Sequence, residues 1–292
     1  MTRRFISVVI SAATGAIAAS ALSAAALTIT PTTSGTDLAA ALGGAGLTIT
    51  SVTITNGVAS QFGTYTGFTS PPVTIDDGVV LSTGQVTQTT SASHSIGTSP
   101  STNLRQPGTA KFDAYGPGHI TNFDDSNDVA SLQVNFSLGS ASQVGFDFVF
   151  GSVEFPEFTN NFTDAFLAFL DGTSTADQIV FDPSNNAVQV GTTFVSSLTT
   201  ADTNTAFFDP HGLVNLQTFT VNPLAAGNHS IIFEVGDVND RRLDSAVFIS
   251  NFHAGAGTGG TGPINPAVPE PTTVLLLGSG LAGLAWWRLR NR

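Results

Sequence analysis

Carboxylate side chains gather in three short segments of this sequence, and their type and spacing could support metal chemistry. The segments are DDSND at 124–128, EFPEFTNNFTD at 154–164 and DVNDRRLD at 237–244. Calcium takes six to eight oxygen ligands, commonly carboxylates and loop carbonyls. We therefore predict a structural calcium ion, with the second segment favoured over the third, and with ligands drawn from Glu154, Glu157, Asp164, Asp237, Asp240 and Asp244.

Two other interpretations of these acidic loops stay open. Asp and Asn side chains also cap turns, which needs no metal. Asp244 could instead form an ion pair with Arg241 or Arg242. The first segment is not an EF-hand, because Val129 stands where that loop requires Gly and Asn135 stands where it requires Glu.

The remaining reactive residues do not indicate catalysis. The chain has no cysteine, which excludes disulfides, thiol catalysis and thiolate metal sites. Its five histidines fall in no paired-ligand spacing, and we expect each of them in a loop or at the surface. Glu154 and Glu157 flank Pro156 in a predicted loop, so their spacing indicates no glycosidase geometry. We predict that the protein is not an enzyme, and a polysaccharide hydrolase is the least favoured alternative.

Charge is distributed unevenly along the chain. Five of the nine basic residues lie at the two ends, which leaves Arg105, Lys111, Arg241 and Arg242 among twenty acidic residues and a net charge of about −16 between them. Such a surface repels phosphate backbones, so we predict no nucleic-acid partner. The acidity either attracts divalent cations or serves solubility alone.

The elements that must position these acids are predicted to be strands. Apolar residues alternate with polar ones at Leu132, Val134 and Phe136, and Thr, Val and Phe favour pleated surfaces. Turn residues recur between such runs, which is typical of a sandwich. We predict an all-β fold, a jelly-roll-like β-sandwich over residues 27–253, with 87–118 as a long polar loop or insertion. The predicted strand segments are 47–55, 76–86, 131–138, 144–151, 164–172, 178–182, 216–221, 229–235 and 245–252.

Aromatic composition indicates packing more than sugar stacking. The chain has 22 Phe but only two Tyr and two Trp, and Phe has no polar group to present to a ligand. Both tryptophans, Trp286 and Trp287, lie at the C-terminal end. The predicted domain therefore offers no Trp to a carbohydrate ring.

The first 26 residues are predicted to be a secretory signal peptide. Arg3 and Arg4 form a basic start, an apolar run follows from Phe5, and small residues precede a predicted cleavage site at Ala26. The protein would then cross the inner membrane through the Sec translocon. An uncleaved N-terminal anchor is the alternative, but the Ala- and Ser-rich run is only weakly apolar.

The other end of the chain, VPEPTTVLLLGSGLAGLAWWRLRNR at 268–292, predicts a short membrane segment. A Gly/Pro-rich stretch at 254–267 would act as a flexible linker before it. No residue from 272 to 287 is charged, so we predict a transmembrane helix there, although the run is shorter than the ~20 residues that span a bilayer comfortably. The arginines that follow should stay in the cytoplasm.

This ending resembles the PEP-CTERM sorting signal of Gram-negative bacteria. The resemblance implies that exosortase, a membrane protease-transpeptidase, cuts near Pro-Glu-Pro and releases or transfers the protein outward, so the inner membrane holds it only transiently. A plain tail anchor is the alternative. The residues that carry the resemblance are Pro269, Glu270, Pro271, Arg288, Arg290 and Arg292.

The middle of the chain resembles the choice-of-anchor L domain, a bacterial extracellular module found upstream of various surface anchors. The resemblance rests on DDGVVLSTG at 76–84, DVASLQVNFSL at 128–138, the long segment 144–172 and FEVGDVNDRRLDSAVFISN at 233–251. Val153, where the family often has an acid, and Thr163, where Asn is common, depart from its pattern.

These observations together predict an exported protein of the cell surface or extracellular matrix. We predict a structural or adhesive role in exopolysaccharide or biofilm, with exopolysaccharide as a partner and no cofactor other than calcium. The alternative is a calcium-dependent carbohydrate-binding module.

Overall fold

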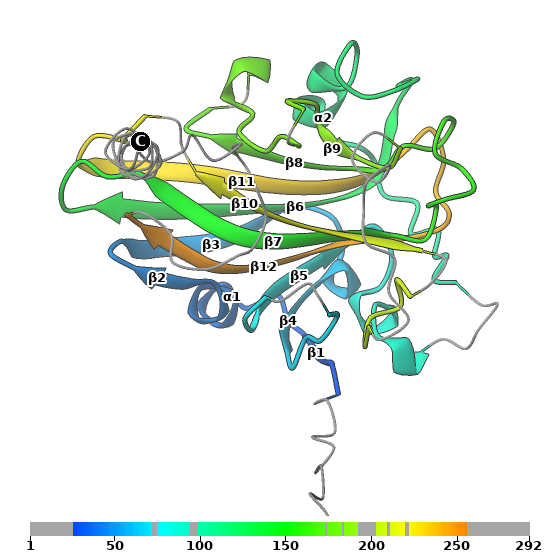
Figure 1. Cartoon of the computed structure of the whole chain (residues 1–292). Coiled ribbons are helices and arrows are strands. Elements are labelled where there is room, and N and C mark those ends of the chain that lie inside the picture. Colours follow the sequence, from blue (N-terminus) through cyan, green and yellow to red (C-terminus); the bar gives the residue numbers. More distant parts are fainter. Residues whose placement is uncertain are drawn as a thin grey trace, which may run out of the picture.

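Two antiparallel sheets pack face to face in the computed structural model of this chain (Figure 1). The structure describes residues 26–71, 75–93, 99–172, 174–182, 184–191, 203–208, 211–219 and 222–255. The predicted signal peptide up to residue 25, most of the linker and the whole sorting signal lie outside these ranges, as does the predicted membrane segment 272–287. Within the described ranges, no helix combines the length and the apolar character needed to cross a membrane.

The larger sheet, sheet A, has seven strands. Its order along the sheet is β1 (Thr28–Pro31), β4 (Phe62–Thr66), β5 (Gly78–Ser82), β12 (Ser245–Ala254), β7 (Val144–Ser152) and β10 (Gly212–Phe219), with β2 (Gly43–Ala45) pairing in parallel with β12. Sheet B has the order β3 (Thr48–Asn56), β6 (Ser126–Leu138), β11 (Gly227–Val238), β8 (Ala165–Leu170) and β9 (Val188–Gln189). From β5 to β8 the chain passes from one sheet to the other with every strand, as it does again from β9 to β12.

Alternating side chains build the apolar core between the sheets. Phe146, Phe148 and Phe150 of β7 all face this core, as their spacing predicted. Val149 points the other way and joins a second apolar cluster on the outer face of sheet A, so every residue of β7 is buried. Because burying one Phe side chain is worth about 1.5–3 kcal/mol, these rings are a main source of stability. The predicted β-sandwich is confirmed.

Two short helices were not predicted. Helix α1 (Gly35–Leu42) begins at Ser34, whose hydroxyl accepts from the Asp37 N–H at 3.2 Å, and it buries Leu38 and Leu42. Helix α2 (Ala110–Tyr115) lies within the stretch expected to be a polar loop and buries Phe112 and Tyr115. Each helix has only two buried positions, which is too few to show a 3.6-residue period in the sequence. Four 3-10 turns complete the described elements: η1 (Ala59–Gln61), η2 (Val86–Gln88), η3 (Ser91–Ser93) and η4 (Thr175–Asp177).

The segment 178–182 differs from its predicted strand. It forms only isolated bridges, between Phe169 and Gln178 and between Phe181 and Ala187. The side chain of Gln178 explains this, because its Oε1 accepts from the backbone N–H groups of Ala168, Ile179 and Val180. A side-chain amide thus competes for the backbone donors that a regular ladder would use, although the Ile179 N–H also donates to the Ala168 carbonyl at 2.9 Å.

Candidate functional site

Five carboxylates lie buried at one end of the sandwich. They stand at or next to strand ends that the registers bring together: Asp237 pairs with Asn127 across β11 and β6, and Ser245 pairs with Ser152 across β12 and β7. The apolar core gives way to acidic side chains at this end. None of the five is more than 2% exposed, and they are Asp128, Glu154, Asp164, Asp237 and Asp244.

Two of these acids are well supplied with hydrogen-bond donors. Asp164 precedes β8, and it accepts from the Val238 N–H at 3.1 Å and from the Ser245 hydroxyl at 2.7 Å, which ties sheet B to sheet A. Asp128, near the start of β6, accepts from the N–H groups of Leu104 and Gln106. These two carboxylates are therefore structural anchors, and Asp128 holds the loop of residues 99–107 against the end of the sandwich.

Only one of the two carboxylate oxygens of Asp244 has a hydrogen-bond donor among the described residues. Its Oδ1 accepts from the Thr102 N–H at 2.7 Å, but its Oδ2 has no hydrogen-bond partner among the described residues. A Cβ at Gly84 would lie 1.7 Å from this Oδ2, so only glycine leaves room for the carboxylate there. Sequence reasoning offered an ion pair with Arg241 or Arg242. The structure shows no such pair in its described part, and Arg241 instead donates from Nε and Nη2 to Asn127 Oδ1.

Glu154 and Asp237 have no hydrogen-bond partner at all within the described ranges. Both side chains are completely buried, and all four of their oxygens lack a donor. The Asp164 N–H lies near Glu154 and lowers its pKa, and the Thr83 hydroxyl lies near Asp237 and lowers its pKa, but neither donor is in hydrogen-bond geometry. The Asp164 carboxyl also lies near that of Asp237. Buried polar atoms are normally paired, so these two carboxyls are exceptions that require an explanation.

Burial and mutual repulsion shift the pKa values of this group upward. Loss of solvation, followed by the negative charges of Asp164, Asp240 and Asp237, raises the pKa of Glu154 to about 12. Burial raises the pKa of Asp164 to about 8, although its hydrogen bonds oppose the change. The pKa of Asp237 is raised well above its usual value by burial and by Asp164, and burial raises that of Asp244 to about 6. The site strongly disfavours its own negative charge.

The structure unites the second and third acidic segments and draws one residue from the first. Of the six predicted calcium ligands, Glu154, Asp164, Asp237 and Asp244 come together in the buried group. Asp240 lies beside them and is half-buried, whereas Glu157 is exposed on the loop between β7 and β8. As the side chains stand, no three acidic or histidine groups in the described ranges are arranged as metal ligands. The predicted calcium ion therefore stays a prediction.

Asp128 is the one member of this group that was not among the six predicted calcium ligands, because it belongs to the first acidic segment. A signal for it was present, because Asp128, Asp164 and Asp244 each lie at or within three residues before a predicted strand and Glu154 lies three residues after another. Antiparallel pairing of those strands places all four at the same end. Thr83, Ser245 and the 99–107 loop had no comparable signal in the sequence.

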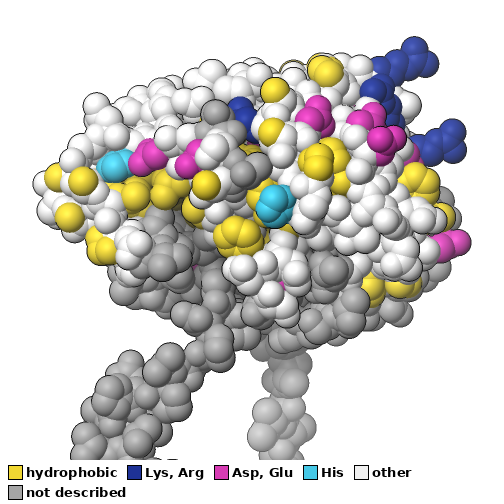
Figure 2. Space-filling model, turned by 90° about the horizontal axis from the view of Figure 1, so that it is seen from above, with side chains coloured by type: hydrophobic (Ala, Val, Ile, Leu, Met, Phe, Trp, Pro, Cys, Tyr) yellow, Lys and Arg dark blue, Asp and Glu magenta, His cyan; other side chains and the backbone are white. Residues whose placement is uncertain are grey.

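A polar pocket opens at the same end of the sandwich. Its volume is about 380 Å³, and amide, carboxylate and guanidinium side chains line it. Figure 2 shows Lys and Arg side chains gathered, beside acidic ones, at one end of the face seen from above. The residues that line the pocket are Asn103, Asp125, Asn127, Asn239, Asp240, Arg241 and Arg242.

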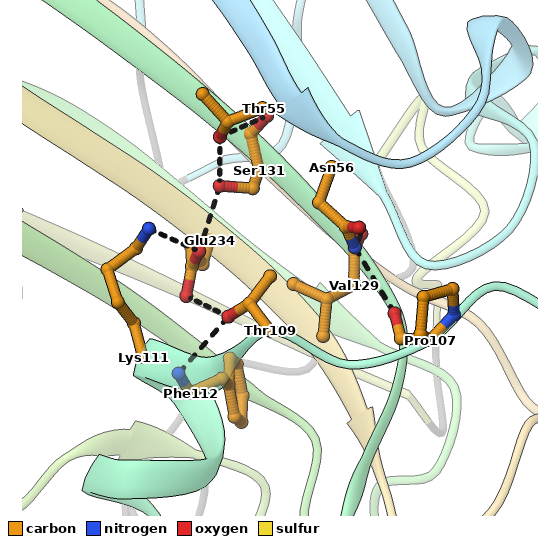
Figure 3. Close-up of polar contacts among 9 residues, drawn as sticks. All are labelled: Thr55, Asn56, Pro107, Thr109, Lys111, Phe112, Val129, Ser131 and Glu234. Atoms are coloured by element: carbon orange, nitrogen blue, oxygen red, sulfur yellow. Dashed lines mark hydrogen bonds and ion pairs between the residues drawn. The ribbon is translucent and has the colours of Figure 1, made fainter.

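A sixth buried acid, Glu234 of β11, lies away from this end on the outer face of sheet B (Figure 3). Its Oε1 accepts from the Ser131 hydroxyl at 2.8 Å, and its Oε2 accepts from the Thr109 hydroxyl at 2.9 Å. The Lys111 Nζ lies 3.8 Å from Oε1. Burial raises the pKa of Glu234, and these partners oppose the rise.

Two histidines depart from the expectation that all five lie in loops or at the surface. His253 lies in β12 and is only 6% exposed, because the strand continues past Phe252 and is paired there with β2 on one side and β7 on the other. His229 lies in β11, where its Nδ1 is 2.6 Å from Asp171 Oδ2. His94 lies outside the described residues.

Comparison with known proteins gave two family matches and weak structural likenesses. A model of the choice-of-anchor L domain matches residues 29–253, and the PEP-CTERM protein-sorting motif matches residues 267–290. The motif marks the chain for export to the cell surface and for processing by exosortase. No curated protein matched this chain.

Two solved structures of carbohydrate-binding modules show some similarity, each at 14% sequence identity. One is a module specific for non-crystalline cellulose, with a TM-score of 0.24, covering 44% of this chain and 68% of that one. The other is a family 35 module from an environmental isolate, with a TM-score of 0.22, covering 61% of this chain and 98% of that one. At such TM-scores neither similarity identifies a shared fold.

Proposed function

Since this chain belongs to the choice-of-anchor L domain family and carries a PEP-CTERM sorting motif, we propose that it is a non-enzymatic component of a Gram-negative extracellular matrix. In this role the β-sandwich is a structural or adhesive part of exopolysaccharide or biofilm. The Sec translocon exports the chain, and segment 272–287 holds it in the inner membrane until exosortase cuts near Pro269–Pro271.

The observation that carries this proposal is the order of the two matches. A folded domain over residues 29–253 is followed within about fifteen residues by the sorting motif. The stretch between them is rich in Gly and Pro, so it can present the cleavage point to a membrane protease without disturbing the last strand. A net charge of about −16 between the termini keeps the released domain soluble.

Mass spectrometry of the mature protein tests the sorting step. We expect the protein recovered from the cell surface to lack Trp286 and Trp287, because exosortase removes the apolar segment. Replacing Pro269, Glu270 and Pro271 by Ala should leave the full C-terminus in place and keep the chain in the membrane fraction. Replacing the linker prolines Pro263 and Pro266 by Ala is the matched control and should not change processing. A surface form that retains both tryptophans would refute the sorting step.

Deletion of the gene tests the matrix role. We expect a mutant lacking this chain to form less cohesive biofilm, and the wild-type chain to restore it. The Pro269–Pro271 variant, which stays in the membrane, should not restore it. A mutant with unchanged matrix would contradict the structural or adhesive role while leaving the sorting step intact.

The polar pocket favours carbohydrate binding as a second candidate function. Amide, carboxylate and guanidinium groups together offer the donors and acceptors that sugar hydroxyls need. Glycan-array binding, measured with and without a chelator, tests this function and its calcium dependence. Arg242→Ala should weaken binding about tenfold or more, whereas Arg105→Ala, an exposed arginine that does not line the pocket, should leave it unchanged.

A further inference from the structure

Five carboxylate oxygens at the acidic end of the sandwich lack hydrogen-bond donors within the described residues. Four belong to Glu154 and Asp237, both completely buried, and the fifth is Asp244 Oδ2. The same end of the molecule supplies donors to Asp128 and Asp164, so the absence is selective. The unpaired oxygens come from the last residues of β11 and from residues next to β7 and β12, and these strands belong to both sheets.

No basic side chain in the described part of the chain neutralises these acids. The ion pairs found there join Lys111 to Glu234 and His229 to Asp171. Arg241, the nearest candidate in sequence, uses its guanidinium on Asn127. Removing an unpaired carboxylate from water costs several kcal/mol, so such a group requires a proton or a cation.

A hard cation satisfies this group better than protons do. A proton shared between two neighbouring carboxyl groups, such as Asp164 and Asp237, satisfies one pair of oxygens, but it leaves the other unpaired oxygens of the group without a donor. A calcium-like ion instead takes several oxygens at once, mono- or bidentate, and tolerates irregular geometry. The buried oxygens without donors are the ligands that such an ion prefers.

We propose that Glu154 and Asp237 bind a hard divalent cation of the calcium type between the two sheets, with Asp244 as the third carboxylate. Binding must turn these side chains toward a common centre, because as they stand they do not form a metal-ligand arrangement. Glu154 has three rotatable side-chain bonds for this movement. Asp164, already held by Val238 and Ser245, serves as a positioning residue, and Glu157 takes no part.

The first test is a calcium titration of the mature protein, purified after export and freed of metal with a chelator. Calcium at about a hundred times its Kd should raise the Tm by roughly 5–10 °C for a domain of this size. Isothermal calorimetry should show one saturable site. This test does not depend on the proposed matrix function, because the purified protein binds calcium or fails to do so whatever its biological role.

Neutral variants of the two ligands locate the site. Glu154→Gln and Asp237→Asn keep the side-chain shape and remove the charge, so each should abolish the rise in Tm. Each metal-free variant should also melt at or above the Tm of the metal-free wild type, because a buried amide needs neither a proton nor a cation. Glu157→Gln, an exposed residue three positions from Glu154, is the matched control and should respond to calcium like the wild type.

Two results would overturn the proposal. The first is a wild-type Tm and calorimetric trace that do not change with millimolar calcium. The second is a response that persists in both Glu154→Gln and Asp237→Asn, which would place calcium elsewhere. Because the two variants are independent, failure of one to fold leaves the other to decide.

Discussion

Glu234 and the Glu154–Asp237 pair are buried equally well but are treated differently by the rest of the chain. Glu234 receives donors from two hydroxyls and has a lysine nearby, and it lies on the outer face of sheet B (Figure 3). Glu154 and Asp237 lie between the sheets with no donor among the described residues. Burial of an acid therefore does not by itself indicate function. The informative observation is a buried acid with no hydrogen-bond donor inside the protein, because such an acid requires a proton or a cation from the solvent.

The largest expected change in stability comes from removing the positive charge of Lys111, which lies beside Glu234. Lys111→Met should destabilise the fold by roughly 2–3 kcal/mol, because it leaves a buried carboxylate with hydroxyl donors alone. The value lies below that for a fully buried pair, since the Lys111 side chain is 20% exposed. Urea unfolding measures the change. Lys111→Arg keeps the charge and should lose much less, and a Met variant within 0.5 kcal/mol of the wild type would contradict this account.

Replacing an acid by its amide should change the free energy of unfolding by a smaller amount, and with opposite signs in the two regions. Glu234→Gln should destabilise the protein by about 1–2 kcal/mol, because an amide nitrogen replaces an oxygen that accepts a hydrogen bond. Asp237→Asn should stabilise the metal-free protein by about 1 kcal/mol, because the amide is neutral without the proton that the buried acid, with its raised pKa, must take up. Both values come from unfolding in the presence of a chelator. Equal signs in the two variants would remove the distinction between the regions.

The smallest effect concerns the exposed acid Asp171 and its partner His229. Burial lowers the pKa of His229, but hydrogen bonds to Asp171 and to the Ala225 carbonyl, together with the Asp171 charge, outweigh it and raise the pKa. The resulting stability is fully present below pH 6.5 and is lost as the pH rises through the raised pKa. We expect less than about 1 kcal/mol, because the Asp171 side chain is 39% exposed. His229→Gln and Asp171→Asn should each flatten this part of the Tm–pH curve, and a curve unchanged in both would exclude the pair as its cause.

The longer strands were predictable because alternation records which side chains enter the core, whereas the short strands β1, β2, β4 and β9 were not predicted. The alternation of Phe146, Phe148 and Phe150, for example, predicts β7. The short helices and segment 178–182 were not predictable, since two buried leucines give no period and the side chain of Gln178 competes for the backbone only in the folded chain. For the site, loop composition identified most of the acids. Whether each acid meets a donor depends on contacts between distant segments, such as Asp128 with Leu104 and Gln106, and no local pattern contains that information.

The position of β12 has a mechanical consequence. It is the last strand of the domain, and it lies inside sheet A with β5 on one side and β7 on the other. A force applied to the chain beyond residue 255 therefore acts first on this strand. Because both of its edges are hydrogen-bonded, drawing this strand out must break the pairing with β5 and with β7, whereas a strand at the sheet edge is held by one neighbour. A domain tethered by this end is built to resist being drawn out by its tether.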